Sequence, residues 1–182
     1  MASKQEGRAL AIERLTTHVL ATGLSQLSLR QLAAAVGISD RMLLYYFHDK
    51  TEVIVEVLQH LGGALTGELE AAIPPTPKRS SQAMIAAASA MVRSPDVQPF
   101  MRLWIEVIAA AARDQAPYAQ IAQQIGAGFL AWIEARLSDD EPDKPATAAM
   151  ILAMIDGLAL LEVCSDGETA DIAARRMGRE PG

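Results

Sequence analysis

The chain has few of the residues from which redox and metal sites are built. Cys164 is its only cysteine, which excludes an intramolecular disulfide and suits a reducing cytoplasm. We expect Cys164 to be a small core residue, with redox sensing as the alternative. The three histidines have no acidic or cysteine partner at metal-ligand spacing, so we expect no metal and no other cofactor.

Sequence motifs for catalysis are also missing. The chain has no Gly-rich phosphate loop and no Gly-x-Ser-x-Gly nucleophile turn. We therefore expect that it is not an enzyme.

Aromatic residues and strand patterns are scarce, whereas signals for helices are frequent. Aromatic residues make up 4% of the 182 residues, and Ala and Leu dominate the 51% that are apolar. Ala and Leu favour helices, and no alternating pattern of a strand is visible. The composition predicts an all-α fold, with about nine helices along the chain.

No segment has the features of a membrane span or an export signal. The longest apolar run, residues 146–161, is short for a span and contains Asp156. The N-terminus has no basic stretch followed by an apolar one. We expect a cytoplasmic protein with no membrane partner.

Positive charge is in excess only near the N-terminus. The net charge is −6, but Lys and Arg outnumber Asp and Glu by six to four in residues 1–50. In residues 51–182 the acidic residues lead by eighteen to ten. A basic excess confined to one region is typical of a surface that binds nucleic acid phosphates.

The same region has the pattern of a helix-turn-helix motif at residues 28–47. Ser28 is a good N-cap for a first helix, and Gly37 stands where that helix must end. Ser39 caps a second helix, in which Leu43 and Phe47 return to the buried side. In this motif the second helix places its first residues in the DNA major groove.

These residues resemble the DNA-binding end of the tetracycline-repressor (TetR) family. The matching features are the turn at 37–39, followed by Leu43, Tyr45, Phe47 and Lys50. Leu44 and Tyr46 depart from the usual layout, in which the family has Tyr and His. The resemblance implies a three-helix DNA-binding domain at residues 5–65 and a helical effector-binding and dimerisation domain at 66–182.

The resemblance also implies a function. The chain would be a repressor that binds a palindromic, double-stranded DNA operator as a homodimer and responds to an unknown small-molecule effector. Repression rather than activation follows from the resemblance alone. The alternative is a non-catalytic helical adaptor that binds other proteins.

DNA contacts are expected from the start of the recognition helix and the residues flanking it. Arg41 is placed to bind a guanine, and Asp40 to accept from a cytosine or to complement the helix dipole. The full predicted set is Arg30, Ser39, Asp40, Arg41, Met42, Tyr45, Tyr46 and Lys50. Arg8 and Arg14, in a first helix at 4–22, lie either along the DNA backbone or on a solvated face.

Asp49 and Glu52 form an Asp-x-x-Glu capping box that starts the next helix. Helices are expected from there on at about 50–72, 78–93, 99–114, 117–137 and 146–164. The segment after Ser165 is expected to be a frayed short helix. Residues 146–161 are apolar nearly all round and need cover on more than one side. The resemblance implies that a second copy covers them. The expected dimer residues are Phe129, Ile133, Met150, Met154 and Leu158.

The effector site has the weakest sequence signal. Large apolar side chains of the central helices either line a cavity or are plain core: Met84, Met91, Met101, Trp104, Ile108, Phe129 and Trp132. Arg102 and Glu106, close to them in the sequence, either bind a polar ligand or face water.

Overall fold

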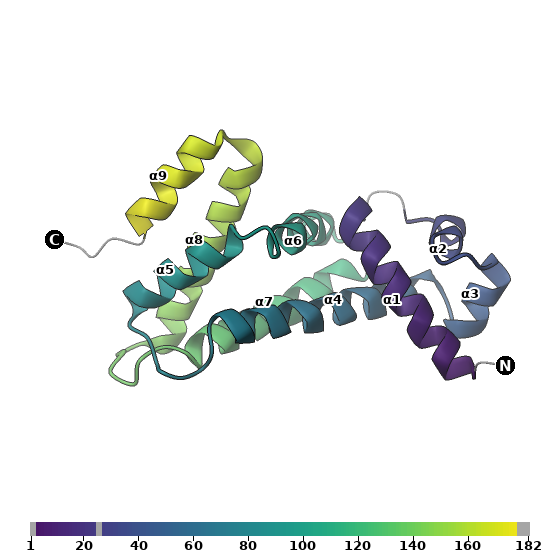
Figure 1. The fold of residues 1–182 in the computed structure, drawn as a ribbon, viewed down its shortest axis with the longest axis horizontal. Helices are drawn as coiled ribbons and strands as arrows, with labels where there is room; N and C mark the ends of the chain where they lie inside the picture. The colour runs from purple at the N-terminus through teal and green to yellow at the C-terminus, as the bar shows by residue number, and fades with distance from the viewer. Residues whose placement is uncertain (1–2, 25–26, 178–182) are drawn as a thin grey trace. The chain divides into compact units, whose positions relative to one another are not determined.

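The computed structural model describes residues 3–24 and 27–177. Within these residues the chain forms nine α-helices and no strand, which confirms the all-α prediction (Figure 1). The helices are α1 (Lys4–Thr22), α2 (Leu29–Val36), α3 (Asp40–Tyr46), α4 (Lys50–Ala72), α5 (Ser81–Val92), α6 (Gln98–Ala111), α7 (Tyr118–Glu134), α8 (Lys144–Cys164) and α9 (Gly167–Met177).

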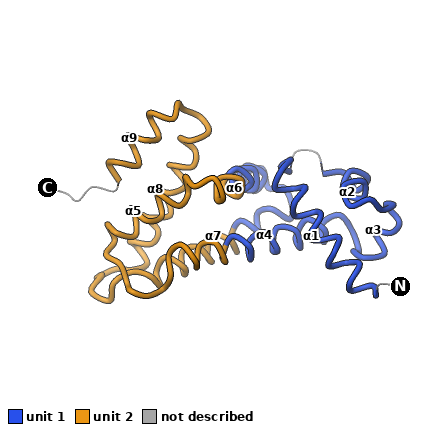
Figure 2. The backbone as a smooth tube through the Cα atoms, viewed as in Figure 1, with its two compact units in different colours: residues 1–65, 102–122 blue, residues 66–101, 123–182 orange. Residues whose placement is uncertain are grey.

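The chain divides into two compact units, coloured blue and orange in Figure 2. Unit 1 combines residues 1–65 with 102–122, and unit 2 combines 66–101 with 123–182. The predicted boundary after residue 65 coincides with a change of unit. Residues 102–122, which were expected in the second domain, are grouped with residues 1–65 in unit 1.

Local sequence signals set the ends of α1 in unit 1. The Ser3 hydroxyl accepts a hydrogen bond from the Glu6 N–H, and the Glu6 carboxylate accepts one from the Ser3 N–H. This reciprocal pair satisfies two backbone donors that a helix start leaves free. Gly23 ends the helix with a φ of 75°. The helix buries Ile12, Leu15 and Val19, as predicted.

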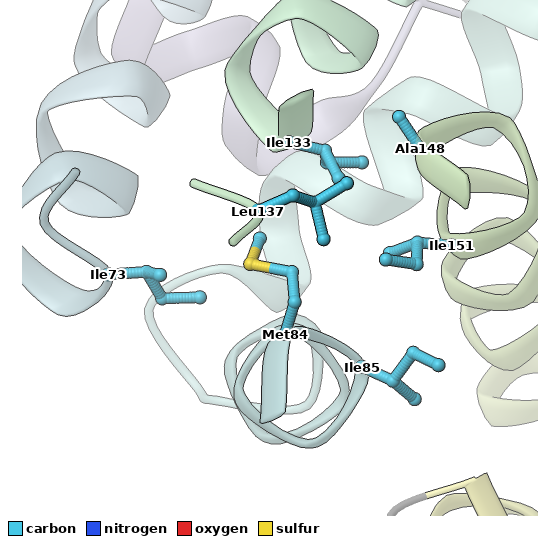
Figure 3. Close-up of a cluster of buried hydrophobic side chains, with 7 residues drawn as sticks. All are labelled: Ile73, Met84, Ile85, Ile133, Leu137, Ala148 and Ile151. Atoms are coloured by element: carbon cyan, nitrogen blue, oxygen red, sulfur yellow. The ribbon is translucent and has the colours of Figure 1, made fainter. Parts of the chain in front are cut away.

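Unit 2 is built on a cluster of buried aliphatic side chains. Figure 3 shows residues of α5, α7 and α8 around one shared space, together with Ile73, which directly follows α4, and Leu137, which lies three residues after the end of α7. The cluster comprises Ile73, Met84, Ile85, Ile133, Leu137, Ala148 and Ile151. Close packing of this kind supplies most of the free energy that holds short helices together.

The C-terminal segment is more ordered than the sequence indicated. Residues Gly167–Met177 form α9, which packs against α5 and α8, and Ala170 is fully buried. Arg93, the residue directly after α5, forms ion pairs with Glu162 of α8 and Asp171 of α9. The predicted short helix is therefore confirmed over Gly167–Met177, where contacts with α5 and α8 hold it in place, and residues 178 and 179 of that prediction lie outside the described residues.

The end of α8 also differs from the prediction. Cys164, expected in the core, is exposed at the last residue of the helix. Among the described helices, α8 alone is long and apolar enough to cross a membrane, judged by length and composition only. Only 22% of its apolar window is buried inside the chain.

One arginine is buried in unit 2. Arg136 is 2% exposed, and its Nε donates to the Ile73 carbonyl at 2.6 Å. Its other nitrogens donate to the Trp132 carbonyl and to the Glu70 carboxylate, and its guanidinium lies 4.0 Å from the centre of the Trp132 ring. Arg136 therefore ties the end of α4 to the end of α7.

We expect Arg136→Ala to lower the free energy of unfolding by about 3–5 kcal/mol, because it leaves a cavity and an unpaired carbonyl at Ile73. Glu68→Ala is the matched control, because it removes a carboxylate from an exposed position of α4 that has no ion pair among the described residues. Its loss should change the free energy of unfolding by less than about 0.5 kcal/mol. Urea denaturation of both variants measures the difference. Equal losses would contradict the role given to Arg136.

Candidate nucleic-acid interface

The turn of the helix-turn-helix motif has the predicted backbone geometry. The Ser28 hydroxyl accepts from the Gln31 N–H, and the Gln31 side chain accepts from the Ser28 N–H. Gly37 has φ 75° and ψ 29°, the left-handed conformation that favours glycine. The Ser39 hydroxyl accepts from the Met42 N–H at 3.2 Å and starts α3.

The recognition helix α3 is held by its buried side. It has only seven residues, too few for a helix to be stable in water by itself. Leu43 is 0% exposed and Phe47, which directly follows α3, is 1% exposed. Both side chains are buried where α1, α2 and α3 pack against one another. This packing fixes which side of α3 faces outward.

The outward side of α3 presents most of the predicted contacts. Asp40 and Arg41 are exposed, and Met42 and Tyr45 are 42% and 56% exposed. Arg30 near the start of α2 and Lys50 at the start of α4 are exposed as well. Ser39 is also exposed, but its hydroxyl is used by the cap.

Three cations of this surface are available to a ligand. Arg30, Arg41 and Lys50 form no ion pair with any residue that the structure describes. Lys50 also stands at a helix N-terminus, where the helix dipole favours negative charge. The arrangement can bind phosphate and, through Arg41, the edge of a base.

Tyr46 has a different place from the predicted one. Its ring packs on α1 at Gly7, where an added Cβ would lie 2.6 Å from the ring carbon Cζ. Its carbonyl accepts a hydrogen bond from Arg8 Nε at 3.2 Å. We therefore assign Tyr46 to the docking of α3 on α1 rather than to a phosphate contact. The Lys4 ammonium lies over the ring of the neighbouring Tyr45, 4.8 Å from the ring centre.

Arg8 connects three helices inside unit 1. Its guanidinium pairs with Glu52 at 2.9 Å and with Glu56, both on α4, and lies 5.0 Å from the Phe47 ring centre. Burial raises the pKa of Glu56 despite the nearby Arg8. The pKa of Glu52 is lowered, first by the hydrogen bond from the His48 N–H and then by Arg8.

Arg14 has a similar internal role, since its Nη1 donates to the Val36 carbonyl at 3.0 Å. Arg8 is therefore paired internally, whereas Arg14 is exposed, as the solvated-face alternative has it, and also donates to the backbone at the end of α2. Their partners are 22 or more residues away in the chain, and no local pattern indicates such a pairing.

The capping box of α4 is shifted by one residue. The Asp49 carboxylate accepts from the Glu52 N–H at 2.9 Å, as predicted, and this bond is the main reason that the pKa of Asp49 is lowered. The Glu52 carboxylate accepts from the His48 N–H instead of that of Asp49. The capped turn holds Lys50 at the start of the helix.

The sequence of the chain matches a model of a known protein family. Residues 77–180 match the model described as the C-terminal part of BetI-type transcriptional repressors, and this match covers more than half of the chain. The chain belongs to the TetR family of transcriptional regulators. No curated protein matches it.

Solved structures share the fold of this TetR-family chain. A TetR-family transcriptional regulator from Cytophaga hutchinsonii has a TM-score of 0.77 at 16% identity, covering 98% of this chain and 94% of the other. A transcriptional regulator from Rhodococcus sp. Rha1 has a TM-score of 0.75 at 21% identity, covering 96% and 99%. A regulator from Saccharomonospora viridis, solved in complex with choline, has a TM-score of 0.68 at 16% identity, covering 95% and 94%.

The predicted effector residues of this TetR-family chain are divided between the two units. Trp104 and Ile108 belong to unit 1, whereas Met84, Phe129 and Trp132 belong to unit 2. Met84 is 0% exposed inside the core cluster, and Trp132 packs against that cluster. Met84 is therefore a core residue, which was the alternative reading of its position.

The predicted dimer residues also need correction. Ile133 and Leu158 are 4% and 1% exposed and belong to the core of their own chain, so they offer no surface to a partner. Met150 is 50% exposed, and Phe129 and Met154 are half-buried. The large apolar side chains of α8 that are exposed are Met150, Leu160 and Val163.

We expect Arg8→Ala to lower the free energy of unfolding by about 1–2 kcal/mol, because α3 and α4 lose shared hydrogen bonds to a half-buried group. Urea denaturation measures this loss. Because α3 is then held less firmly, the affinity for DNA should fall. Because Arg8 is paired internally, the dependence of that affinity on salt should not change. A smaller slope of log affinity against log salt would show that Arg8 contacts a phosphate.

Proposed function

We propose that this transcriptional regulator is a ligand-responsive repressor that binds a palindromic operator as a homodimer. The observation that carries the proposal is the exposed group of Arg30, Arg41 and Lys50 around a recognition helix that is docked by Leu43 and Phe47. The protein would act in the cytoplasm and without catalysis.

Each residue of this surface has a distinct role in the proposal. Arg41 reads a guanine through two parallel hydrogen bonds, and Met42 contacts a thymine methyl group. Lys50 and Arg30 bind phosphates, and Tyr45 supplies a hydroxyl to the backbone. Asp40 lies in the first turn of α3, where a carboxylate complements the helix dipole.

A second copy is needed for affinity and for a specific operator. One seven-residue helix contacts too few base pairs to find a unique site. Helix α8 leaves Met150, Leu160 and Val163 exposed, and TetR-family regulators are typically dimers. Pairing through α7 and α8 would cover these side chains. Two recognition helices about one DNA turn apart then require a palindrome.

Regulation would follow from linkage between DNA and effector. A ligand that binds better to a dimer with the wrong spacing of recognition helices lowers DNA affinity by the same coupling factor. The family model describes repressors, and a structural relative was solved with choline, which supports a small-molecule effector here. We place the effector in the helical part of the chain that the family model covers, near Phe129 and Trp132.

Two substitutions test the DNA surface. We expect Arg41→Ala to weaken operator binding about ten- to a hundredfold, because the base contact is lost. Lys50→Ala should also weaken binding and should reduce the salt slope by about 0.9, the contribution of one phosphate. Fluorescence anisotropy at several salt concentrations measures both effects.

Arg176→Ala is the matched control, because it removes the same charge from an exposed position on α9 in unit 2. All three variants should keep the wild-type melting temperature and mass. Unchanged binding by Arg41→Ala and Lys50→Ala would overturn the proposed DNA surface.

The dimer surface is tested by Met150→Asp. A carboxylate at this exposed position of α8 would have to be buried without a partner in the proposed dimer, so we expect monomers. Ile172→Asp, on the 56% exposed Ile172 of α9, should remain dimeric. Sedimentation equilibrium gives both masses. A dimer of Met150→Asp that is as stable as the wild type would contradict pairing through α8.

A further inference from the structure

Helix α6 forms a direct hydrogen bond to the chain segment that leads into the helix-turn-helix motif. The Glu106 carboxylate accepts from the Leu24 N–H at 2.7 Å, across 82 residues of sequence. Both residues belong to unit 1. Glu106 was expected to bind a polar ligand or to face water, and its carboxylate instead binds backbone.

The backbone at the end of α1 is shaped to admit this carboxylate. Gly23 has φ 75° and ψ −168°, a combination that is essentially restricted to glycine. A Cβ at Gly23 would lie 2.9 Å from Glu106 Cδ, so a side chain would also displace the carboxylate. Two independent constraints therefore require glycine at this position.

The bond to Leu24 is not needed to finish α1. The Gly23 N–H already donates to the Val19 carbonyl at 2.8 Å and closes the last turn. Leu24 is the next residue and begins the connection to Ser28, the cap of α2. Glu106 thus holds the backbone at Leu24 from outside the three helices of the motif.

The same part of the chain also lies near the cation at the start of α4. One open hollow in unit 1 is lined by the α1–α2 connection, the first turn of α2, the start of α4 and the α6–α7 turn: Leu24, Leu27, Ser28, Gln31, Lys50, Gln115, Ala116 and Tyr118. Burial raises the pKa of Tyr118, and the nearby Glu106 carboxylate raises it further. Leu24, whose N–H Glu106 binds, therefore lines the same hollow as the α2 cap Ser28 and Lys50.

We propose that Glu106 is a positioning residue for DNA binding, which sets the placement of α2 and α3 by accepting the Leu24 N–H. This inference rests on the proposed function, because it concerns the affinity for an operator. The side chain touches no DNA and acts through the backbone at Gly23 and Leu24.

The test compares Glu106→Ala with Glu106→Gln in the full-length chain. Alanine removes the acceptor, whereas glutamine keeps a carbonyl oxygen for the Leu24 N–H and loses only the charge. Glu13→Ala, at an exposed position of α1, controls for loss of one negative charge in unit 1. Operator affinity, melting temperature and hydrogen exchange of the Leu24 amide are measured for each.

We expect Glu106→Ala to bind a selected operator about tenfold more weakly, the equivalent of one hydrogen bond to a charged group, and to exchange the Leu24 amide faster. Glu106→Gln should lose clearly less affinity than Glu106→Ala, since it keeps a neutral acceptor, and Glu13→Ala should bind within about twofold of the wild type. Wild-type affinity of Glu106→Ala, or an equal loss in Glu106→Gln, would overturn the positioning role. Failure of the wild-type protein to bind any operator would instead refute the proposed function.

Discussion

The docking of α3 is the constraint on which the rest of unit 1 depends. A seven-residue helix cannot hold its own shape in water, so its orientation comes from its neighbours. Leu43 and Phe47 bury its inner side, and Arg8 binds the carbonyl at its end while pairing with α4. Because these contacts turn one side inward, Arg41 and the other exposed residues of α3 are presented outward as a set.

The cations of this acidic chain fall into two groups with different physical roles. One group donates its hydrogen bonds to backbone carbonyls and carboxylates of distant segments, and each member connects one helix to another. This group comprises Arg8, Arg14 and Arg136. Arg30 and Arg41 lie exposed on the helix-turn-helix motif without ion pairs among the described residues. The sequence gives the number of cationic residues. Only the folded structure shows which of them are paired with other groups and which remain available to bind DNA.

The parts of the fold that depend only on residues close together in the sequence were predictable from the sequence. The cap at Ser39 and the left-handed turn at Gly37 are local choices of the backbone, and the helical spacing of Leu43 and Phe47 is visible directly. Contacts between distant segments were not predictable. The bond from Leu24 to Glu106, the burial of Ile133 and Leu158 and the order of α9 depend on which helices meet, and no spacing in the sequence encodes that.

The central claim is that the docked recognition helix reads a specific, two-fold symmetric DNA sequence. Selection of bound fragments from random double-stranded DNA tests this claim most directly. We expect the wild-type protein to enrich one palindrome whose half-sites lie about one helical turn apart. Enrichment of no sequence, or of a single half-site without its symmetric copy, would contradict it.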